Sequence, residues 1–311
     1  MKILFMGTPE PAAKCLEALI DAGENIVAVI TQPDRPKGRG LKLSQPAVKE
    51  VAVKNNIPVH QPEKIKEPSA IELVKKIDPE LIVVVAYGKI LPKAIIDHPK
   101  YGSINVHASM LPKYRGAAPV QWALLNGEKE TGITIQKVFE ALDTGDIILQ
   151  QKIQIADEDN TSTLTRKLFE SGPKLLIEAV RLILSGKCPS IKQDDLKATY
   201  APQLTKETGL IDWGKPTMKI FDQVRGCYPW PSAYTYYMGK MLKVLSAYRG
   251  LATHDKKPGT VIDFAEDEGF IVATGDGSLF IKEVQLEGGK RMHAWQFLNG
   301  HRILIGDQFP S

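Results

Sequence analysis

The apolar run at residues 81–86, LIVVVA, limits the possible folds of this chain more than any other segment. A short, uninterrupted and β-branched run of this kind is typical of a strand that is buried on both faces. Such strands lie inside parallel sheets, whose two faces are covered by helices. The run therefore predicts an α/β domain with this segment as a central strand of its sheet.

The segments around this run continue the same alternation of strand and helix. Residues 2–6 form a short apolar strand, Gly7 permits a tight turn, and Thr8 and Pro9 suit the start of a helix, with Thr8 as its cap. The β-branched run at 26–31 completes a β-α-β unit with parallel strands. Further helices are expected at 47–55, 69–77, 117–125 and 161–184, the last interrupted at Gly172-Pro173, and further strands at 57–60, 103–107, 131–139 and 147–155. We predict a doubly wound, Rossmann-like N-terminal domain over residues 1–190, extended by two antiparallel strands.

The last third of the chain has a different pattern. Because 311 residues exceed the usual span of one hydrophobic core, two domains are expected. Residues 191–205 are polar and weakly periodic, which is typical of a linker. Beyond them we expect a helix at 218–225 and short strands at 233–237, 241–248, 259–265, 269–274 and 278–286. This spacing predicts a C-terminal β-barrel domain, OB-like, over residues 206–311.

Composition restricts the compartment and the partners. The net charge of +4 is only mildly basic, so a nucleic-acid partner would require positive charge concentrated in one place. Cys15, Cys188 and Cys227 are sparse and form no CxxC pair, which fits a reducing compartment and offers no metal site. No segment approaches the roughly 20 apolar residues that span a bilayer. We expect a cytoplasmic protein with no membrane partner and no metal.

The densest set of chemically useful side chains lies between residues 103 and 119. Asn105 and His107 are two residues apart, so on a strand they face the same side of the sheet. They end a strand of a parallel sheet, and ligands of open α/β sheets bind at that edge. Asp143, in the Gly-containing turn at 142–146, is the nearest attractive carboxylate. Each residue also has a structural interpretation, which for Asp143 is the ordinary turn-forming role of Asp.

A second candidate region is the stretch at residues 32–46, which is rich in Pro, Gly and cations. We expect an exposed loop there. Arg35, Lys37, Arg39 and Lys42 lie close together with no acidic residue among them. A solvated basic loop is one interpretation; contact with RNA is the other, because Arg binds phosphates in bidentate fashion and stacks on bases.

Several motifs together resemble the folate-dependent formyltransferase family, in which an Asn, a His two residues later and a downstream Asp form the active site. The similarity extends over both expected domains and is specifically to the methionyl-tRNA formyltransferases of that family. The motifs that carry it are FMGTP at 5–9, TQPDRPKGRG at 31–40, VAYG at 85–88, HASMLPKYRGAAPVQWALLNGEKETGITI at 107–135 and YPWP at 228–231.

The resemblance implies a site and a co-substrate. It assigns catalysis to Asn105, His107 and Asp143, with 10-formyltetrahydrofolate as co-substrate and no metal. Asn105 and His107 would stabilise the oxyanion formed at the formyl carbon, and Asp143 would orient His107 and help to take the amine proton, directly or through water. The folate would lie against two segments, Tyr87, Gly88, Ile90 and Leu91, and Ser109, Met110, Leu111 and Pro112. Met110 stands where the family usually has Leu, a change that keeps apolar volume.

The resemblance also implies an acceptor, the α-amino group of initiator methionyl-tRNA, and hence a role in translation initiation. Arg35, Lys37, Arg39 and Lys42 would contact the acceptor arm, and the C-terminal barrel would bind the tRNA. Two alternatives share part of this pattern. One is a formyltransferase for a sugar nucleotide or glycinamide ribonucleotide, which would not need the basic loop or the β-rich final third. The other is an RNA-binding module without catalysis, against which the complete Asn-His-Asp set argues.

Overall fold

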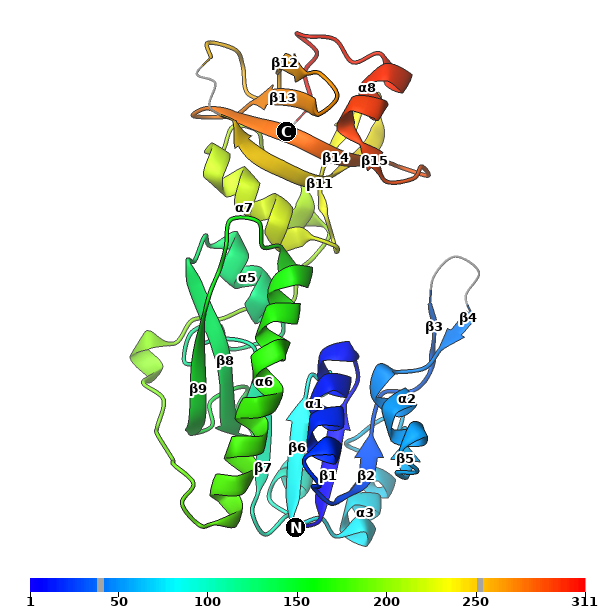
Figure 1. Cartoon of the computed structure of the whole chain (residues 1–311), viewed down its shortest axis with the longest axis vertical. Helices are drawn as coiled ribbons and strands as arrows, with labels where there is room; N and C mark the ends of the chain where they lie inside the picture. The colour runs from blue at the N-terminus through cyan, green and yellow to red at the C-terminus, as the bar shows by residue number, and fades with distance from the viewer. Residues whose placement is uncertain (38–41, 251–253, 311) are drawn as a thin grey trace. The chain divides into compact units, whose positions relative to one another are not determined.

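The computed structural model describes residues 1–37, 42–250 and 254–310. Contacts between residues divide the chain into two compact units, which Figure 1 displays. The N-terminal unit comprises residues 1–116, 130–154 and 165–201, and the C-terminal unit comprises residues 117–129, 155–164 and 202–311. Within the described residues, no helix has the length and apolar character that crossing a membrane requires.

The N-terminal unit is built on a seven-stranded sheet with the order β5-β2-β1-β6-β7-β8-β9. The strands are β1 (Ile3–Gly7), β2 (Ile26–Ile30), β5 (Val59–His60), β6 (Leu81–Val85), β7 (Ser103–His107), β8 (Glu130–Lys137) and β9 (Ile147–Gln154). The first five in this order pair in parallel, whereas β8 is antiparallel to both β7 and β9. The predicted Rossmann-like sheet is confirmed, with the apolar run at 81–86 as the central strand β6.

Helices cover both faces of this sheet (Figure 1). They are α1 (Glu10–Asp21), α2 (Ala47–Lys54), α3 (Pro68–Ile77), α4 (Lys93–Ile96) and most of α6 (Thr161–Leu184), with a short 3-10 helix, η1 (Asp195–Lys197). One face packs Leu4, Met6 and Ile30 against Val74 of α3 and Ile95 of α4. Helices α1 and α2 contact β1, β2 and β6. Because alternate residues of each strand face opposite sides, one short apolar run can fill two cores.

Two local expectations were wrong. The N-cap of α1 is Pro9, without a side-chain capping bond, because the Thr8 hydroxyl donates instead to the carbonyl of Tyr87 at 3.2 Å. Helix α6 continues through Pro173 without the interruption expected at that point. A Cβ on Gly172 would lie 2.5 Å from Cδ1 of Ile133, so glycine serves there to bring the helix close to β8. Tertiary packing of this kind stabilises a helix more than local propensity does.

The C-terminal unit contains an antiparallel sheet with the order β10-β11-β14-β13-β12, and β15 pairs with β14. Its elements are α5 (Pro119–Leu125), η2 (Glu207–Gly209), α7 (Thr217–Cys227), β10 (Ala233–Tyr237), β11 (Lys240–Gly250), β12 (Val261–Ala265), β13 (Gly269–Ala273), β14 (Ser278–Leu286), β15 (Met292–His293) and α8 (Ala294–His301). Trp213, Phe270 and Phe297 are the largest fully buried side chains of its core. This barrel-like β domain agrees with the expectation.

The predicted linker is packed against the N-terminal unit over much of its length. Ile191 forms an antiparallel bridge with Ile147, and Tyr200 forms a parallel bridge with Arg115. The C-terminal unit also includes α5, which contacts α7. The compact units therefore interleave along the chain. The boundaries at 190 and 206 stay a prediction about folding domains.

Candidate functional site

The carboxyl edge of the parallel sheet brings together the three polar residues singled out above. Asn105 and His107 lie on β7, where they pair with Gln136 and Thr134 of the antiparallel neighbour β8. Asp143 comes from the connection between β8 and β9. Strand β8 runs antiparallel to β7 and ends beside its start, with Lys137 opposite Ile104, so the connection that follows can reach Asn105 and His107. Asp143 thereby meets two residues almost 40 positions earlier in the sequence.

Each oxygen of the Asp143 carboxylate has its own set of partners. Oδ1 accepts hydrogen bonds from Nε2 of Gln136 at 2.8 Å and from Nδ2 of Asn105 at 3.4 Å. Oδ2 accepts the backbone N–H of Gly116 at 2.9 Å and lies 3.5 Å from Nδ1 of His107. Three donors and the adjacent His107 ring thus surround one carboxylate, which fixes its orientation more firmly than a single ion pair would.

The contacts of His107 determine where its protons lie. The ring is only 5% exposed, and Nε2 lies 2.9 Å from the carbonyl oxygen of Tyr114. Because a carbonyl can only accept, Nε2 must carry a proton. The other ring nitrogen, Nδ1, faces the Asp143 carboxylate at 3.5 Å, so two oxygen neighbours fix the orientation of the ring.

Gln136 belongs to this cluster, although the sequence analysis did not identify it. It is 1% exposed, and it stands beside Ile133 and Ile135, which are also buried. In the alternating pattern of a strand, Thr134 and Gln136 share one face and the two isoleucines the other. The alternation of Thr134 and Gln136 with the two isoleucines was the available signal in the sequence. A polar residue on a largely buried strand requires a hydrogen-bond partner, and this requirement indicates a polar cluster at that position.

The first predicted folate-binding segment is divided between core and surface. Tyr87 and Leu91 are buried in the apolar cluster that also contains Met6 and Ile82, whereas Gly88 and Ile90 are exposed, Ile90 by 58%. Burial raises the pKa of the Tyr87 hydroxyl to about 12. Among the residues that the structure describes, this hydroxyl has no hydrogen-bond partner. Only Gly88 and Ile90 of this segment are freely accessible to a ligand.

The second predicted folate-binding segment is held by the sheet. The Ser109 hydroxyl donates to the carbonyl of Lys113 at 2.6 Å, and the carbonyl of Ser109 accepts from the hydroxyl of Thr134 at 2.6 Å. Buried Leu111 is bonded through its backbone to Thr134 and Gln150. The partly exposed residues are Met110, which packs against Gly132, and Pro112. The segment therefore has a defined shape next to His107.

The basic stretch is a hairpin, not the loop that we expected. Strands β3 (Arg35–Lys37) and β4 (Lys42–Ser44) pair in antiparallel register, with Lys37 opposite Lys42. Pro36 is compatible with this pairing because a two-stranded ribbon has open edges. Arg35 is exposed. Arg39 lies outside the described residues.

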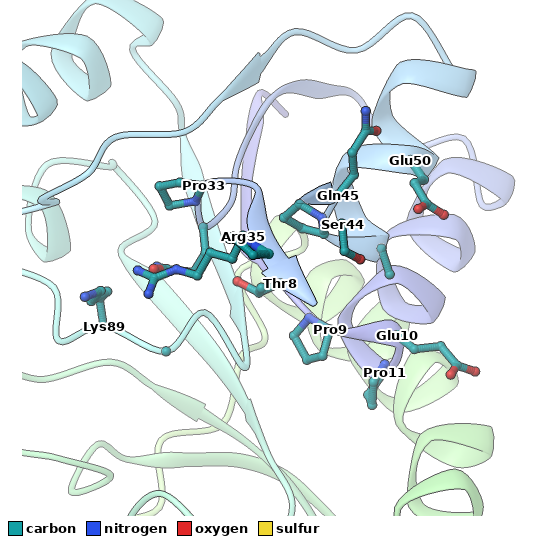
Figure 2. A pocket seen from close by; sticks show the side chains of 15 residues that line it. Thr8, Pro9, Glu10, Pro11, Pro33, Arg35, Ser44, Gln45, Glu50 and Lys89 are labelled. Atoms are coloured by element: carbon teal, nitrogen blue, oxygen red, sulfur yellow. The ribbon is translucent and has the colours of Figure 1, made fainter. Parts of the chain in front are cut away.

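An open pocket lies beside this hairpin, within the N-terminal unit. Its lining includes Thr8 and Pro9 from the start of α1, Arg35 and Lys89. Figure 2 shows the Arg35 and Lys89 side chains reaching the same side of this pocket. Asn105, His107 and Asp143 are not part of its lining. In the described part of the chain, no group of three or more His, Cys, Asp or Glu side chains is arranged to hold a metal ion.

Comparison with known proteins identifies the family of this chain. Residues 1–180 match the family described as Formyl transferase, and residues 203–302 match its C-terminal domain. A methionyl-tRNA formyltransferase from Geotalea uraniireducens is 50% identical over 307 residues, which cover 98% of this chain and 97% of that protein. The chain belongs to the methionyl-tRNA formyltransferase family.

Solved structures share the fold of this family at much lower identity. HypX from Aquifex aeolicus in complex with tetrahydrofolic acid matches with a TM-score of 0.67 at 18% identity, over 96% of this chain and 47% of HypX. The chain thus spans about half the length of HypX. An N-formyltransferase from Helicobacter canadensis, in complex with folinic acid and dTDP-3-aminofucose, matches with a TM-score of 0.67 at 19% identity, over 94% of this chain and 100% of that protein. These likenesses confirm the two-part formyl transferase fold.

Proposed function

We propose that this member of the methionyl-tRNA formyltransferase family is a one-carbon transferase that moves the formyl group of 10-formyltetrahydrofolate to the α-amino group of initiator methionyl-tRNA. The observation that carries the proposal is the arrangement around Asp143. A buried carboxylate holds the Asn105 amide and the His107 ring side by side at the carboxyl edge of the sheet. This is the edge at which open α/β folds bind their ligands.

The cluster suits the charge that develops during formyl transfer. Attack by the amine on the formyl carbon gives a tetrahedral state with negative charge on the former carbonyl oxygen. The Asn105 amide has two N–H groups and gives one of them to Asp143 at 3.4 Å, so the other can donate to that oxygen. The His107 ring, oriented by Asp143, stabilises the same oxygen electrostatically. Donors held in place before the reaction are the largest source of catalysis in acyl transfer.

Proton transfer completes the reaction. The amine nitrogen forms a bond to the formyl carbon, the bond from that carbon to N10 of the folate breaks, and the proton released by the amine passes to N10. Both oxygens of Asp143 already accept hydrogen bonds, from Gln136 and from Gly116. Because both oxygens are already held by donors, we assign Asp143 to orienting His107, with proton transfer through water.

The binding roles follow from the accessible parts of each predicted segment. Gly88, Ile90, Met110 and Pro112 offer an apolar wall for the folate ring system. Arg35 and Lys89 offer positive charge for the phosphates of the acceptor end. The name of the relatives, at 50% identity over nearly the whole chain, favours methionyl-tRNA over a sugar nucleotide as acceptor.

The test is a direct competition between acceptors. The full-length protein is incubated with 10-formyltetrahydrofolate and, in separate reactions, with initiator methionyl-tRNA, an amino-sugar nucleotide or glycinamide ribonucleotide. We expect formylated methionyl-tRNA and a kcat/KM for the other two at least about 10³-fold lower, the discrimination that several lost contacts produce. Transfer to a sugar nucleotide or glycinamide ribonucleotide in preference would contradict the proposal. Binding of tRNA without transfer would indicate an RNA-binding module.

A further inference from the structure

We infer that Gln193 is a positioning residue for formyl transfer, acting on the catalytic centre through the turn that carries Asp143. The inference rests on the proposed function. Gln193 is half-buried in the segment that the sequence analysis assigned to a linker, about 50 residues beyond Asp143. Its side chain nevertheless reaches the β8–β9 connection of the same compact unit.

The nitrogen of the Gln193 amide donates hydrogen bonds to the turn that carries Asp143 and to Gln136. Nε2 lies 2.8 Å from the carbonyl oxygen of Asp143, 2.7 Å from that of Gly145 and 3.2 Å from Oε1 of Gln136. Gln136 in turn donates to Asp143 Oδ1 at 2.8 Å. Gln193 therefore supports the Asp143 carboxylate in two ways. It binds the backbone carbonyl of Asp143, and it binds Gln136, which donates to the carboxylate.

The oxygen of the same amide is held from the other side. Oε1 of Gln193 accepts from Nε of Arg115 at 3.1 Å and from an Nη of Arg115 at 2.9 Å. Because an arginine only donates, the amide oxygen must face Arg115 and the amide nitrogen must face the turn. The Arg115 side chain is only 3% exposed and is also paired with Asp195. Gln193 is thus locked in a single orientation.

The turn requires this support because its backbone is strained. Asp143 has a φ of 54°, the left-handed region that non-glycine residues seldom adopt. A Cβ on Gly145 would lie 1.7 Å from the carbonyl oxygen of Lys137, so the chain passes very close to β8. Such a conformation persists only where the surroundings hold it. The two carbonyls that Gln193 binds lie at these two residues.

The backbone next to Arg115 links the same segment to the other side of Asp143. Residues 199 and 201 pair with Arg115, through Arg115 N to Thr199 O at 2.8 Å and Ala201 N to Arg115 O at 2.7 Å. The next residue, Gly116, donates its N–H to Asp143 Oδ2. Residues 193–201 thus fix both the turn that carries Asp143 and the position of Gly116, whose N–H donates to the Asp143 carboxylate.

The experiment removes the N–H groups of the Gln193 amide and leaves an oxygen in place for Arg115. Gln193→Glu keeps the size and the bond to Arg115 but has no N–H for the two carbonyls. We expect kcat for methionyl-tRNA formylation to fall about 10- to 100-fold, the usual effect of a small displacement of a catalytic group. KM for folate and for tRNA should stay within about twofold, because the proposed binding surfaces of both ligands do not include Gln193. Gln203→Glu, an exposed glutamine on the same segment, is the matched control and should keep wild-type kcat.

A double-mutant cycle separates positioning from general stability. If Gln193 acts through Asp143, Gln193→Glu should have less than about twofold further effect on the single-turnover rate in an Asp143→Asn background. Multiplying effects, or a wild-type kcat for Gln193→Glu, would overturn the inference. Gln193→Met, which removes both halves of the amide, takes its place in the same cycle if the charged variant does not fold. The wild type is assayed first, so an inactive wild type contradicts the proposed function itself.

Discussion

The Asp143 cluster and the β3–β4 hairpin occupy the same compact unit but are built in opposite ways. Around Asp143, three donors and the His107 ring converge on one carboxylate, and the side chains of His107 and Gln136 are almost completely buried. The hairpin consists of two three-residue strands, and Arg35 at its start is exposed. One region holds its polar groups through hydrogen bonds to neighbours, and the other presents Arg35 to solvent.

This difference matches two physical tasks. Stabilising a developing oxyanion needs dipoles that do not move during the reaction, and the hydrogen-bond network around Asp143 provides that rigidity. Attracting a polyanion needs charge that acts over several ångströms and adapts to the partner, which exposed cations provide. We therefore expect changes in the cluster to lower kcat, and changes in the hairpin to weaken the interaction with tRNA.

The largest effect is expected in the cluster. Asn105→Ala and His107→Ala should each lower kcat about 10²- to 10³-fold, because each removes a group that stabilises the oxyanion. Affinity for tRNA, measured by filter binding, should remain within about twofold. His98→Ala is the matched control, since His98 precedes β7 at the opposite edge of the sheet. Near-normal turnover in either cluster variant would remove that residue from the mechanism.

The next effect concerns the rigidity of the turn. Gly145→Ala places a methyl group against the carbonyl of Lys137, so the turn must shift and take Asp143 with it. We expect a loss of stability of about 1–3 kcal/mol from overpacking, and kcat lowered about tenfold. Thermal unfolding and steady-state kinetics measure the two quantities. Gly300→Ala, at a helix position with open space, should be neutral or slightly stabilising. Unchanged kinetics for Gly145→Ala would mean that the turn tolerates movement.

A smaller effect is expected in the hairpin. Arg39→Ala and Arg35→Ala should each lower kcat/KM for methionyl-tRNA about tenfold, the contribution of one charge-assisted contact, without changing KM for folate. Arg→Lys at either position should restore only part of the loss, because lysine keeps the charge but lacks the planar fork. Arg181→Ala removes the same charge from the exposed face of α6 and serves as the control. Equal losses in the control would indicate a general effect of net charge.

The smallest effect is expected for the two lysines. Lys37→Ala or Lys42→Ala should weaken tRNA binding only about two- to threefold at moderate salt, and each should reduce the slope of log K against log salt by about one unit. Lys76→Ala, on α3, should leave the slope unchanged. Binding isotherms at four salt concentrations give the slopes. A wild-type slope in both hairpin variants would exclude these lysines from phosphate contact.

The parts of the fold that depend on local pattern were predictable. The apolar run at 81–86 indicated β6, and the two-residue spacing of Asn105 and His107 placed both at the end of one strand. Local pattern failed where distant residues decide the outcome. Thr8 donates to Tyr87 instead of capping α1, and α6 passes through Pro173 because it packs on the sheet.

The sequence selected three residues that the structure brings together, but it did not indicate all of the residues that hold them in place. Motif resemblance supplied Asn105, His107 and Asp143, but no spacing rule connects them with Gln136 or Gln193. Gln136 lies on β8, just before the connection that carries Asp143. Gln193 reaches that connection because residues 191–201 belong to the same compact unit. The bonds from Gln193 to a turn about 50 residues earlier are a property of the tertiary structure and leave no periodic signal, whereas the alternating polarity of β8 was a signal for Gln136.

The most direct test of the contrast between cluster and hairpin is the single-turnover rate of formylation against methionyl-tRNA concentration, for the wild type, Asn105→Ala and Arg35→Ala. We expect Asn105→Ala to lower the plateau rate about 10²-fold or more with an unchanged half-saturating concentration. Arg35→Ala should reach the wild-type plateau but need about tenfold more tRNA. A lowered plateau for Arg35→Ala, or a raised half-saturating concentration with a normal plateau for Asn105→Ala, would contradict the assignment of catalysis to the Asp143 cluster and of tRNA binding to the hairpin.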